Sequence, residues 1–295
     1  MNWFTDEEDL SKKDLLSCLK SSKSMYAVEL RPPPSGLSSS DAMMNWIDLN
    51  HSIRTLVRED NFVFFTDDAV GSAEEENLAH ISSNLGTDIP YSRIIPFLTC
   101  NHTLEHSLMY VDRLKTEGYG ALTVLGGDSS PGVVRCFPHA FLLREQIRLR
   151  HPTLTLGGWM NPHREVNRQV SYLSSEDFNA DYYMTQIVSH HSLDRVEMFL
   201  EESARQGVTT PGVFGVFYYW GASPKTLEKL GEFFPVPIEQ LKREFAEGET
   251  AEAILARTIE GLKSLGIEKF YLSNLGRRQV RLRLDQVTNE ISSSE

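Results

Sequence analysis

Short apolar runs of strand length alternate with longer segments of helical periodicity along almost all of this 295-residue chain. A lead-in segment from Asp6 to about Lys20 places its leucines at helical spacing. The expected strands after it are Met25–Leu30, Phe62–Phe65, Ile94–Leu98, Ala121–Leu125, Leu154–Leu156, Tyr182–Ile187, Gly212–Val216 and Phe270–Leu272. Eight strands alternating with helices over about 250 residues predict an α/β protein, a single (β/α)8 TIM barrel with an N-terminal lead-in helix.

The same pattern sets the expected domain limits, with a helical extension at 1–24, the barrel at 25–276 and a C-terminal tail at 277–295. The alternative fold is a doubly wound sheet, which would place a glycine-rich phosphate loop after the first strand. That strand instead runs into Arg31-Pro32-Pro33-Pro34, which cannot form a G-x-G-x-x-G turn. In a barrel, polar residues just past the carboxyl ends of the strands face the active site, and we search for function there.

Charge and cysteine content narrow the classes of function. The 29 Lys+Arg against 41 Asp+Glu give a formal charge of −12, which argues against a nucleic-acid partner. Cys18, Cys100 and Cys136 are far apart and form no C-x-x-C, so neither a disulfide scaffold nor a zinc ribbon is predicted. The acidic N-terminus is unlike a signal peptide, and no apolar run approaches the roughly 20 residues of a membrane span. We therefore expect a cytoplasmic protein with no membrane partner.

Polar residues follow several of the expected strands. They are Glu29, Thr66, Asp67, Asp68, Thr99, Asp128, Trp159, His163, Gln186 and Asn274. Glu29 lies among apolar residues and prolines, and such desolvation raises a carboxyl pKa toward the range of a general acid near neutrality. An ordinary strand glutamate paired with Arg31 fits the sequence equally well.

Asp128 and Gln186 each have a functional and a structural interpretation. Asp128 follows two glycines, so its backbone is free to approach a ligand, but it also fits a helix N-cap or a turn. Gln186 can both donate to and accept from one edge of a planar heterocycle, and it also fits a buried structural amide.

Motifs for metal binding and nucleophilic catalysis are weak. His190-His191 and Asp67-Asp68 are candidate ligands, but no H-x-H or H-E-x-x-H motif supports a metal, and we predict none. No G-x-S-x-G motif is present, and Cys100 fits a packed small residue better than a nucleophile. The aromatic segment 214–221 fits either a stacking surface for a flat ligand or a wedge onto the barrel rim. Ser223 and Pro224 after it predict a helix start.

Taken in order, the strand-end residues resemble motifs of the methylenetetrahydrofolate reductase family. Glu29-Leu30-Arg31-Pro32-Pro33 is similar to the family's E-F-F-P-P, Phe97-Leu98-Thr99-Cys100 to its H-L-T-C, and Gly126-Gly127-Asp128 to its R-G-D. Looser likenesses are Phe65-Thr66 to V-T, Trp159-Met160-Asn161-Pro162-His163 to Y-P-E-x-H, Met184-Thr185-Gln186 to I-T-Q, Pro211-Gly212-Val213 to P-G-I, and Tyr271-Leu272-Ser273-Asn274 to the C-terminal end. The resemblance spans about residues 5–278.

The resemblance implies a barrel that reduces 5,10-methylenetetrahydrofolate to 5-methyltetrahydrofolate. Glu29 would be the general acid that helps to open the imidazolidine ring, Asp128 would bind the pterin and support the developing cation, and Gln186 would hold the folate. The expected site residues are catalytic Glu29 and Asp128, substrate-binding Gln186, Thr66, Thr99 and Asp128, and cofactor-binding Trp159, His163, Tyr218 and Tyr219.

The departures from the family fall on its flavin side. Phe97 stands at the family's histidine and Gly126 at its arginine. By position, Arg168 and Ser175 stand at the aspartate and lysine that cradle the flavin, and Glu176-Asp177 follows. Because cations are lost where a diphosphate needs them, we expect FAD to bind weakly or not at all. NADH or NADPH would then pass hydride directly to the folate, with Tyr218 and Tyr219 in the aromatic segment free to stack the nicotinamide or pterin.

Two other functions fit the same residues. A folate-dependent methyl or one-carbon transferase on this barrel would keep Glu29, Asp128 and Gln186 without redox chemistry. A non-catalytic folate-binding partner subunit would not need Glu29 for its function. The basic segment from Arg277 to Arg283 could reach either a ligand or a neighbouring molecule, and the sequence does not choose between them.

Overall fold

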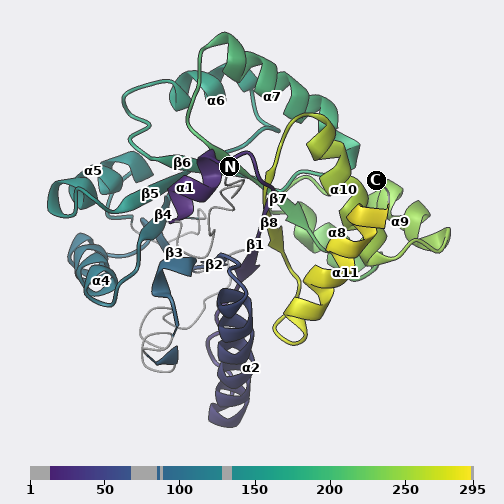
Figure 1. The fold of residues 1–295 in the computed structure, drawn as a ribbon, viewed down its shortest axis with the longest axis horizontal. Helices are drawn as coiled ribbons and strands as arrows, with labels where there is room; N and C mark the ends of the chain where they lie inside the picture. The colour runs from purple at the N-terminus through teal and green to yellow at the C-terminus, as the bar shows by residue number, and fades with distance from the viewer. Residues whose placement is uncertain (1–13, 68–84, 87–88, 128–134, 294–295) are drawn as a thin grey trace, which may run out of the picture.

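The eight parallel strands close into a barrel in chain order, with β1 pairing to β2 on one side and to β8 on the other. A computed structural model describes this fold over residues 14–67, 85–86, 89–127 and 135–293 (Figure 1). The strands are β1 (Met25–Leu30), β2 (Val63–Phe65), β3 (Ile94–Thr99), β4 (Ala121–Leu125), β5 (Thr155–Met160), β6 (Tyr182–Thr185), β7 (Gly212–Phe217) and β8 (Lys269–Ser273). The predicted (β/α)8 barrel with its N-terminal helix is confirmed.

Helices surround the barrel on its outside (Figure 1). They are α1 (Leu15–Lys20), α2 (Ser39–Arg58), α4 (Leu104–Thr116), α5 (Ala140–Arg150), α6 (Val166–Leu173), α7 (Leu193–Arg205), α8 (Pro224–Gly231), α9 (Ile238–Ala246), α10 (Ala251–Ser264) and α11 (Val280–Ser293), with short 3-10 turns η3 (Tyr91–Arg93) and η4 (His190–Ser192). Hydroxyl side chains begin several of them, as where Thr103 accepts from the His106 N–H and Thr250 from the Ala253 N–H. Within the described residues, no helix is long and apolar enough to cross a membrane.

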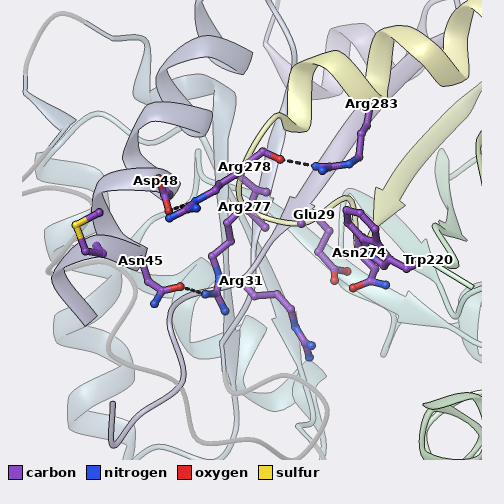
Figure 2. Close-up of a pocket in the computed structure, with 12 residues that line it drawn as sticks. Glu29, Arg31, Asn45, Asp48, Trp220, Asn274, Arg277, Arg278 and Arg283 are labelled. Atoms are coloured by element: carbon purple, nitrogen blue, oxygen red, sulfur yellow. Dashed lines mark hydrogen bonds and ion pairs between the residues drawn. The ribbon is translucent and has the colours of Figure 1, made fainter. Parts of the chain in front are cut away.

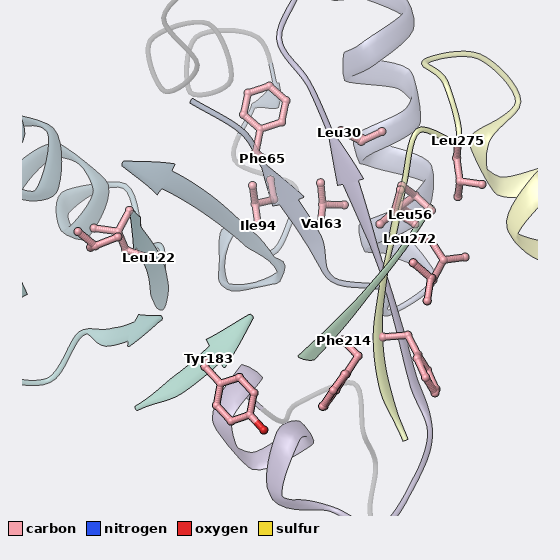
Figure 3. Packing of buried hydrophobic residues seen from close by; sticks show 14 of the residues in the cluster. Leu30, Leu56, Val63, Phe65, Ile94, Leu122, Tyr183, Phe214, Leu272 and Leu275 are labelled. Atoms are coloured by element: carbon pink, nitrogen blue, oxygen red, sulfur yellow. The ribbon is translucent and has the colours of Figure 1, made fainter. Parts of the chain in front are cut away.

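The outward-facing strand residues pack against these helices. Leu30, Val63, Phe214 and Leu272 project from the outer face of the barrel and join one buried cluster with Leu56 of α2 (Figure 3). Because successive residues of a strand point to opposite faces, the residues between them point into the barrel.

The C-terminal helix completes the outer layer. The segment 277–295 was expected to be a tail, and the helix within it, α11, packs against α2 and α10. Val280, Leu284, Val287 and Ile291 of α11 are all buried. The loop that precedes α11 is therefore tied down at both ends, to β8 and to the helical layer.

Helix α1 covers the amino end of the barrel. Leu15, Cys18 and Leu19 are buried in the same cluster as the inward-facing strand residues. The Lys269 ammonium, at the start of β8, donates to the carbonyl of Lys23 just after α1. With its amino end closed in this way, the barrel interior can meet a ligand at its carboxyl end.

Candidate functional site

The alternation along the strands brings one inward-facing side chain from each strand to the carboxyl end of the barrel. Each of these residues is one of the last two of its strand or follows the strand directly. They are Glu29, Thr66, Thr99, Leu125, Trp159, Gln186, Phe217 and Ser273. All of them line one cavity of about 410 Å³, which we call the central cavity.

The floor of the central cavity is the next layer of inward-facing residues. Phe97 and Tyr271 line it from below, and the Tyr271 hydroxyl donates to the Thr185 carbonyl at 2.6 Å. Room for the tyrosine ring comes from Gly215 on β7, where a Cβ would collide with the ring of Tyr271. The glycine and the tyrosine thus form a matched pair that closes the barrel beneath the site.

Glu29 lies at the wall of the central cavity. Ser273 Oγ donates to Glu29 Oε1 at 2.8 Å across the β1–β8 seam. Burial raises the pKa of Glu29, while the Arg31 guanidinium and the Ser273 hydroxyl act more weakly to lower it. A carboxyl group with a raised pKa in a cavity has the property required of a proton donor near neutrality.

Thr99 is held in position by a carboxylate behind it. Asp67 Oδ2 accepts from the Thr99 backbone N–H at 2.8 Å and from Thr99 Oγ1 at 3.0 Å. The same oxygen pairs with His102 Nε2 at 2.8 Å, and the rings of His102 and His106 stack with centroids 4.7 Å apart. Asp67 therefore fixes the end of β3 and the orientation of the Thr99 hydroxyl.

Gln186 lines the central cavity and also ties two loops together. Its amide Nε2 donates to the Phe233 carbonyl at 3.2 Å, and its Oε1 accepts from the Ile187 N–H at 2.9 Å. An amide has two N–H donors and two acceptor lone pairs, so one of each is left over for a ligand. The structural and the ligand-binding interpretations of Gln186 are compatible.

One wall of the central cavity comes from a region that sequence reasoning missed. Thr226, Leu230, Phe233 and Phe234, on α8 and just after it, face the strand-end layer across the cavity. The two adjacent phenylalanines after α8 are the one sequence feature that could have indicated this wall. Their spacing, however, does not show which way their side chains point. Together with Phe217 they make one side of the cavity aromatic.

Three of the residues expected to contact a cofactor do not line the central cavity. Tyr218 points outward, where its hydroxyl donates to Glu252 Oε1 at 2.6 Å, and Tyr219 is buried with its ring against that of Phe217. His163 borders a separate outer groove, and its Nε2 bonds to the Ile187 carbonyl at 2.7 Å. Strand alternation explains the direction of Tyr218: Phe217 continues the inward face of β7, and the next residue turns away.

The turn after β4 brings backbone to the central cavity. Gly126 and Gly127 line it. Gly127 has φ +79°, a backbone conformation that residues other than glycine rarely adopt. A Cβ on Gly127 would also lie 2.5 Å from the side chain of Asn101. Asp128, the expected second catalytic residue, falls outside the described residues.

Comparison with known proteins shows the fold. No protein-family model and no curated protein matches this sequence. Among solved structures, an uncharacterised protein from Clostridium thermocellum aligns with TM-score 0.63 and 16% identity, covering 92% of this chain and 95% of that one. An F420-dependent secondary alcohol dehydrogenase aligns with TM-score 0.53 and 11% identity, covering 92% of this chain and 99% of that one. At these identities the likeness establishes the barrel alone.

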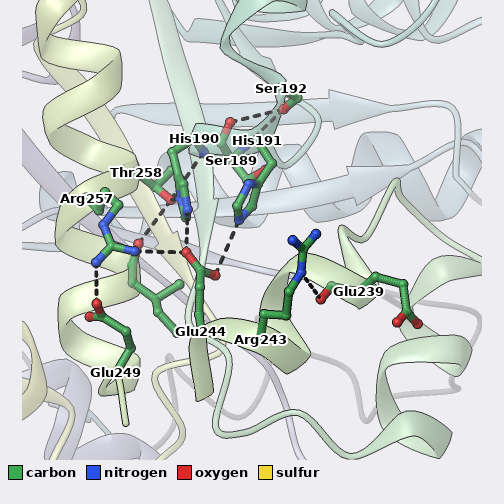
Figure 4. A network of polar contacts seen from close by, with 11 residues as sticks. Ser189, His190, His191, Ser192, Glu239, Arg243, Glu244, Glu249, Arg257 and Thr258 are labelled. Atoms are coloured by element: carbon green, nitrogen blue, oxygen red, sulfur yellow. Dashed lines mark hydrogen bonds and ion pairs between the residues drawn. The ribbon is translucent and has the colours of Figure 1, made fainter. Parts of the chain in front are cut away.

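A second polar cluster lies outside the central cavity. Glu244 of α9 accepts from His190 Nε2 at 2.8 Å, from His191 Nε2 at 3.3 Å and from Arg257 at 2.9 Å (Figure 4). Burial lowers the pKa of His190. Burial acts to raise the pKa of Glu244, but the bonds from the two histidines lower it. These groups are near enough to hold a metal ion, and in this structure Glu244 pairs with the two histidines and with Arg257. We interpret the cluster as a clamp that joins the loop after β6 to α9 and α10.

Proposed function

We propose that this barrel binds a reduced folate in the central cavity and reduces 5,10-methylenetetrahydrofolate to 5-methyltetrahydrofolate with NADH or NADPH. The observation that carries the proposal is Glu29, a carboxyl group with a raised pKa in the wall of the cavity. It stands at the strand end where the sequence resembles methylenetetrahydrofolate reductases.

The chemistry assigned to Glu29 is a proton transfer. Its proton passes to the ring nitrogen that leaves when the imidazolidine C–N bond breaks, and the other nitrogen becomes an iminium. A hydride from C4 of the reduced nicotinamide then adds to the methylene carbon, so the folate gains the methyl group and the nicotinamide is oxidised. Glu29 is left as a carboxylate and recovers its proton from solvent. Because Ser273 donates to Oε1, Oε2 is the oxygen that carries the transferred proton.

The remaining walls suit a flat, polar heterocycle. Trp159 and Phe217 offer apolar ring surface on two sides of the central cavity. Thr66, Thr99 and the remaining donor and acceptor of Gln186 offer hydrogen bonds to its edges. A cavity that is mostly apolar with a few convergent polar groups is typical of a small-molecule site.

The comparison with known structures supports a folate as the ligand. The Clostridium thermocellum protein is described as binding two copies of 5-methyl-5,6,7,8-tetrahydrofolic acid. The other aligned structure is described as an F420-dependent secondary alcohol dehydrogenase in complex with an F420-acetone adduct. Both descriptions belong to those proteins, and they make the folate and the hydride step reasonable choices for this one.

We further propose that hydride transfer needs no flavin. Arg168 and Ser175, at the positions of the family's flavin-cradling aspartate and lysine, do not border the central cavity, and Gly126, which lines it at the position of the family's arginine, offers no cation. Arg168 is exposed on α6, and the Ser175 hydroxyl is bonded to the Tyr172 carbonyl at 2.7 Å. Two exposed carboxylates, Glu176 and Asp177, follow them.

The test is an absorbance spectrum of the purified protein followed by an assay of NADH oxidation with methylenetetrahydrofolate. We expect no flavin band and NADH oxidation that depends on the folate. A stoichiometric flavin band would refute the flavin-free form of the proposal. Folate-independent oxidation, or none with either NADH or NADPH, would refute the reductase.

A folate-dependent methyl transferase is the second candidate. The observation in its favour is that the Clostridium thermocellum protein binds the methyl donor itself. It would use the same central cavity, with Glu29 protonating the nitrogen from which the methyl group departs. Folate binding without any nicotinamide oxidation would favour transfer over reduction.

A further inference from the structure

A second cavity of about 480 Å³ adjoins the central cavity and shares Glu29, Arg31 and Asn274 with it. It lies between α2, the segment after β7 and the loop after β8 (Figure 2). We call it the arginine pocket, because Arg277, Arg278 and Arg283 line it together with Arg31. Its position makes the two cavities parts of one continuous site with Glu29 at their boundary.

The arginines are held in place around this pocket. Arg278 Nε pairs with Asp48 Oδ2 at 2.6 Å, and Arg277 bonds to the side chain of Asn45. Arg283 lies over the ring of Trp220, 4.4 Å from its centroid, and donates to the Leu275 carbonyl at 2.9 Å. Such contacts position guanidinium groups before a ligand arrives, which lowers the entropic cost of binding.

The charge of the pocket is opposite to that of the protein. The chain has a formal charge of −12, yet this wall gathers four arginines. Among the described lining residues, Asp48 and Glu29 are the acidic ones. Even with both of these carboxyl groups ionised, the four arginines outnumber them. The local field therefore attracts anions although the molecule as a whole repels them.

The backbone of the pocket is of a kind that suits phosphate. Asn274, Gly276 and Gln279 all have positive φ, and these left-handed residues turn the chain from β8 into the start of α11. α11 has 14 residues, and its N-terminal end adds a partial positive charge beside the arginines. In (β/α)8 barrels, phosphate sites are commonly built from the loops after strands seven and eight with a nearby helix N-terminus.

We infer that the arginine pocket binds the diphosphate of the nicotinamide dinucleotide, so that its nicotinamide enters the central cavity beside Glu29. The inference rests on the proposed function for the identity of the dinucleotide. Arginine forks match phosphate oxygens in pairs, and the Trp220 indole, 54% exposed at the rim, offers apolar surface for a sugar or base. The family's flavin-phosphate positions lack cations in this chain, and in this inference Arg277 and Arg278 of the loop after β8 bind the phosphates of the nicotinamide dinucleotide instead.

The first test removes two charges from the full-length protein. In the double variant Arg277→Gln/Arg278→Gln we expect the Kd for NADH to rise roughly tenfold or more, as for lost charge-assisted contacts to an anion. The Kd for 5-methyltetrahydrofolate should stay within about twofold. Arg281→Gln is the matched control, because Arg281 is on the same segment but pairs with Glu59 and Asp285 outside the pocket. We expect both affinities of this control to equal those of the wild type.

The second test uses the wild-type protein, so it does not depend on how the double variant folds. ADP-ribose, which has the diphosphate without the nicotinamide, should compete with NADH, and rising salt should weaken the binding of both. 5-Methyltetrahydropteroate, which lacks the glutamate, should bind about as well as 5-methyltetrahydrofolate. ADP-ribose that fails to compete, or no binding of NADH and NADPH at all, would overturn the inference.

Two further results would assign the pocket to a folate instead. The double variant could weaken folate binding and leave NADH unaffected, or the wild type could bind two folates per chain with the variant losing one. Either result overturns the inference. If NADH binds as expected but is never oxidised with methylenetetrahydrofolate, the reductase proposal fails and the diphosphate pocket stands. The binding and turnover measurements therefore separate the two claims.

Discussion

The central cavity and the arginine pocket share a wall but have different physical origins. The central cavity is the last inward layer of the barrel, so its position follows from the two-residue repeat of the strands. The arginine pocket is lined by residues of α2, α11, the end of β1 and two loops, so its position depends on how these separate elements pack together. The first is an apolar cavity with a single raised-pKa carboxyl group, and the second is a cationic surface. The difference suggests that the central cavity holds the reacting ring and that the arginine pocket holds an anionic group.

The sharpest way to break this comparison is to remove the proton donor at the boundary. Glu29→Gln should lower kcat for folate-dependent NADH oxidation by roughly 10²–10⁴-fold, the usual range for a lost general acid, and leave folate affinity little changed. Glu268→Gln is the matched control, because Glu268 precedes β8 at the opposite end of the barrel. Turnover of Glu29→Gln within a few-fold of the wild type would contradict the assigned role and favour a non-catalytic folate-binding subunit.

The second prediction concerns the rigid barrel interior beneath the central cavity. In Gly157→Ala the new Cβ would lie 2.5 Å from the ring of Tyr182, whose hydroxyl bonds to Thr123 Oγ1 at 2.7 Å. We expect the free energy of unfolding to fall by roughly 1–3 kcal/mol, as for other overpacked interiors. Gly231→Ala, with nothing within 4 Å of the new Cβ, is the control and should be neutral or slightly stabilising. Denaturant titration measures both, and equal stabilities would argue against a close-packed floor.

The third prediction is a pH dependence of stability. Burial raises the folded-state pKa of Glu29 above its ordinary value of 4.5, so the native state holds this proton more tightly than the unfolded chain. The stabilising contribution is complete below pH 4.5 and is lost as pH rises through the folded pKa. Each unit of pKa shift corresponds to about 1.4 kcal/mol. Glu29→Gln should therefore gain stability relative to the wild type as pH rises through that window, and denaturant midpoints at several pH values measure it. A constant difference would refute the shift.

The smallest expected effect lies in the arginine pocket. Asp48 is the carboxylate that pairs with Arg278, and its side chain is 24% exposed. Asp48→Asn should tighten NADH binding by roughly 2–5-fold, because removal of a negative charge from the pocket outweighs the loss of a weak near-surface pair that positions Arg278. Asp41→Asn, on the same helix but outside the pocket, is the control and should bind NADH like the wild type. Weaker or unchanged NADH binding by Asp48→Asn would argue against an anion in this pocket.

The strands show how much of the site could be predicted from sequence. β1 and β4 begin and end where their apolar runs do, so Glu29 was correctly placed at a strand end. β5 instead extends to Met160, because a run interrupted by Gly157 and Gly158 still pairs on both sides. Because glycine has no apolar side chain, the apolar pattern alone does not show that the strand continues through these two positions. A Cβ at Gly157 would collide with the ring of Tyr182, and one at Gly158 with the ring of Phe178.

The aromatic segment shows which side-chain directions the sequence does not predict. Sequence reasoning placed Tyr218 and Tyr219 against the ligand, but Phe217 lines the central cavity and Trp220 the arginine pocket. Composition identified the segment as a ring-rich loop after β7. Which ring faces which cavity depends on partners distant in the chain, such as Glu252 for Tyr218 and Arg283 for Trp220.

By itself, the sequence determined the barrel and the strand ends that carry Glu29, Thr66, Thr99, Trp159 and Gln186, because strand periodicity is local and a parallel barrel repeats it eight times. Only the tertiary structure decided that Phe233 and Phe234 close the central cavity, and that the arginines after β8 surround a second pocket beside Glu29. Some of these contacts join segments more than 200 residues apart, as between Asp48 and Arg278. Loops carry no repeat that fixes the direction of a side chain, so their contacts follow from the closed fold and not from local pattern.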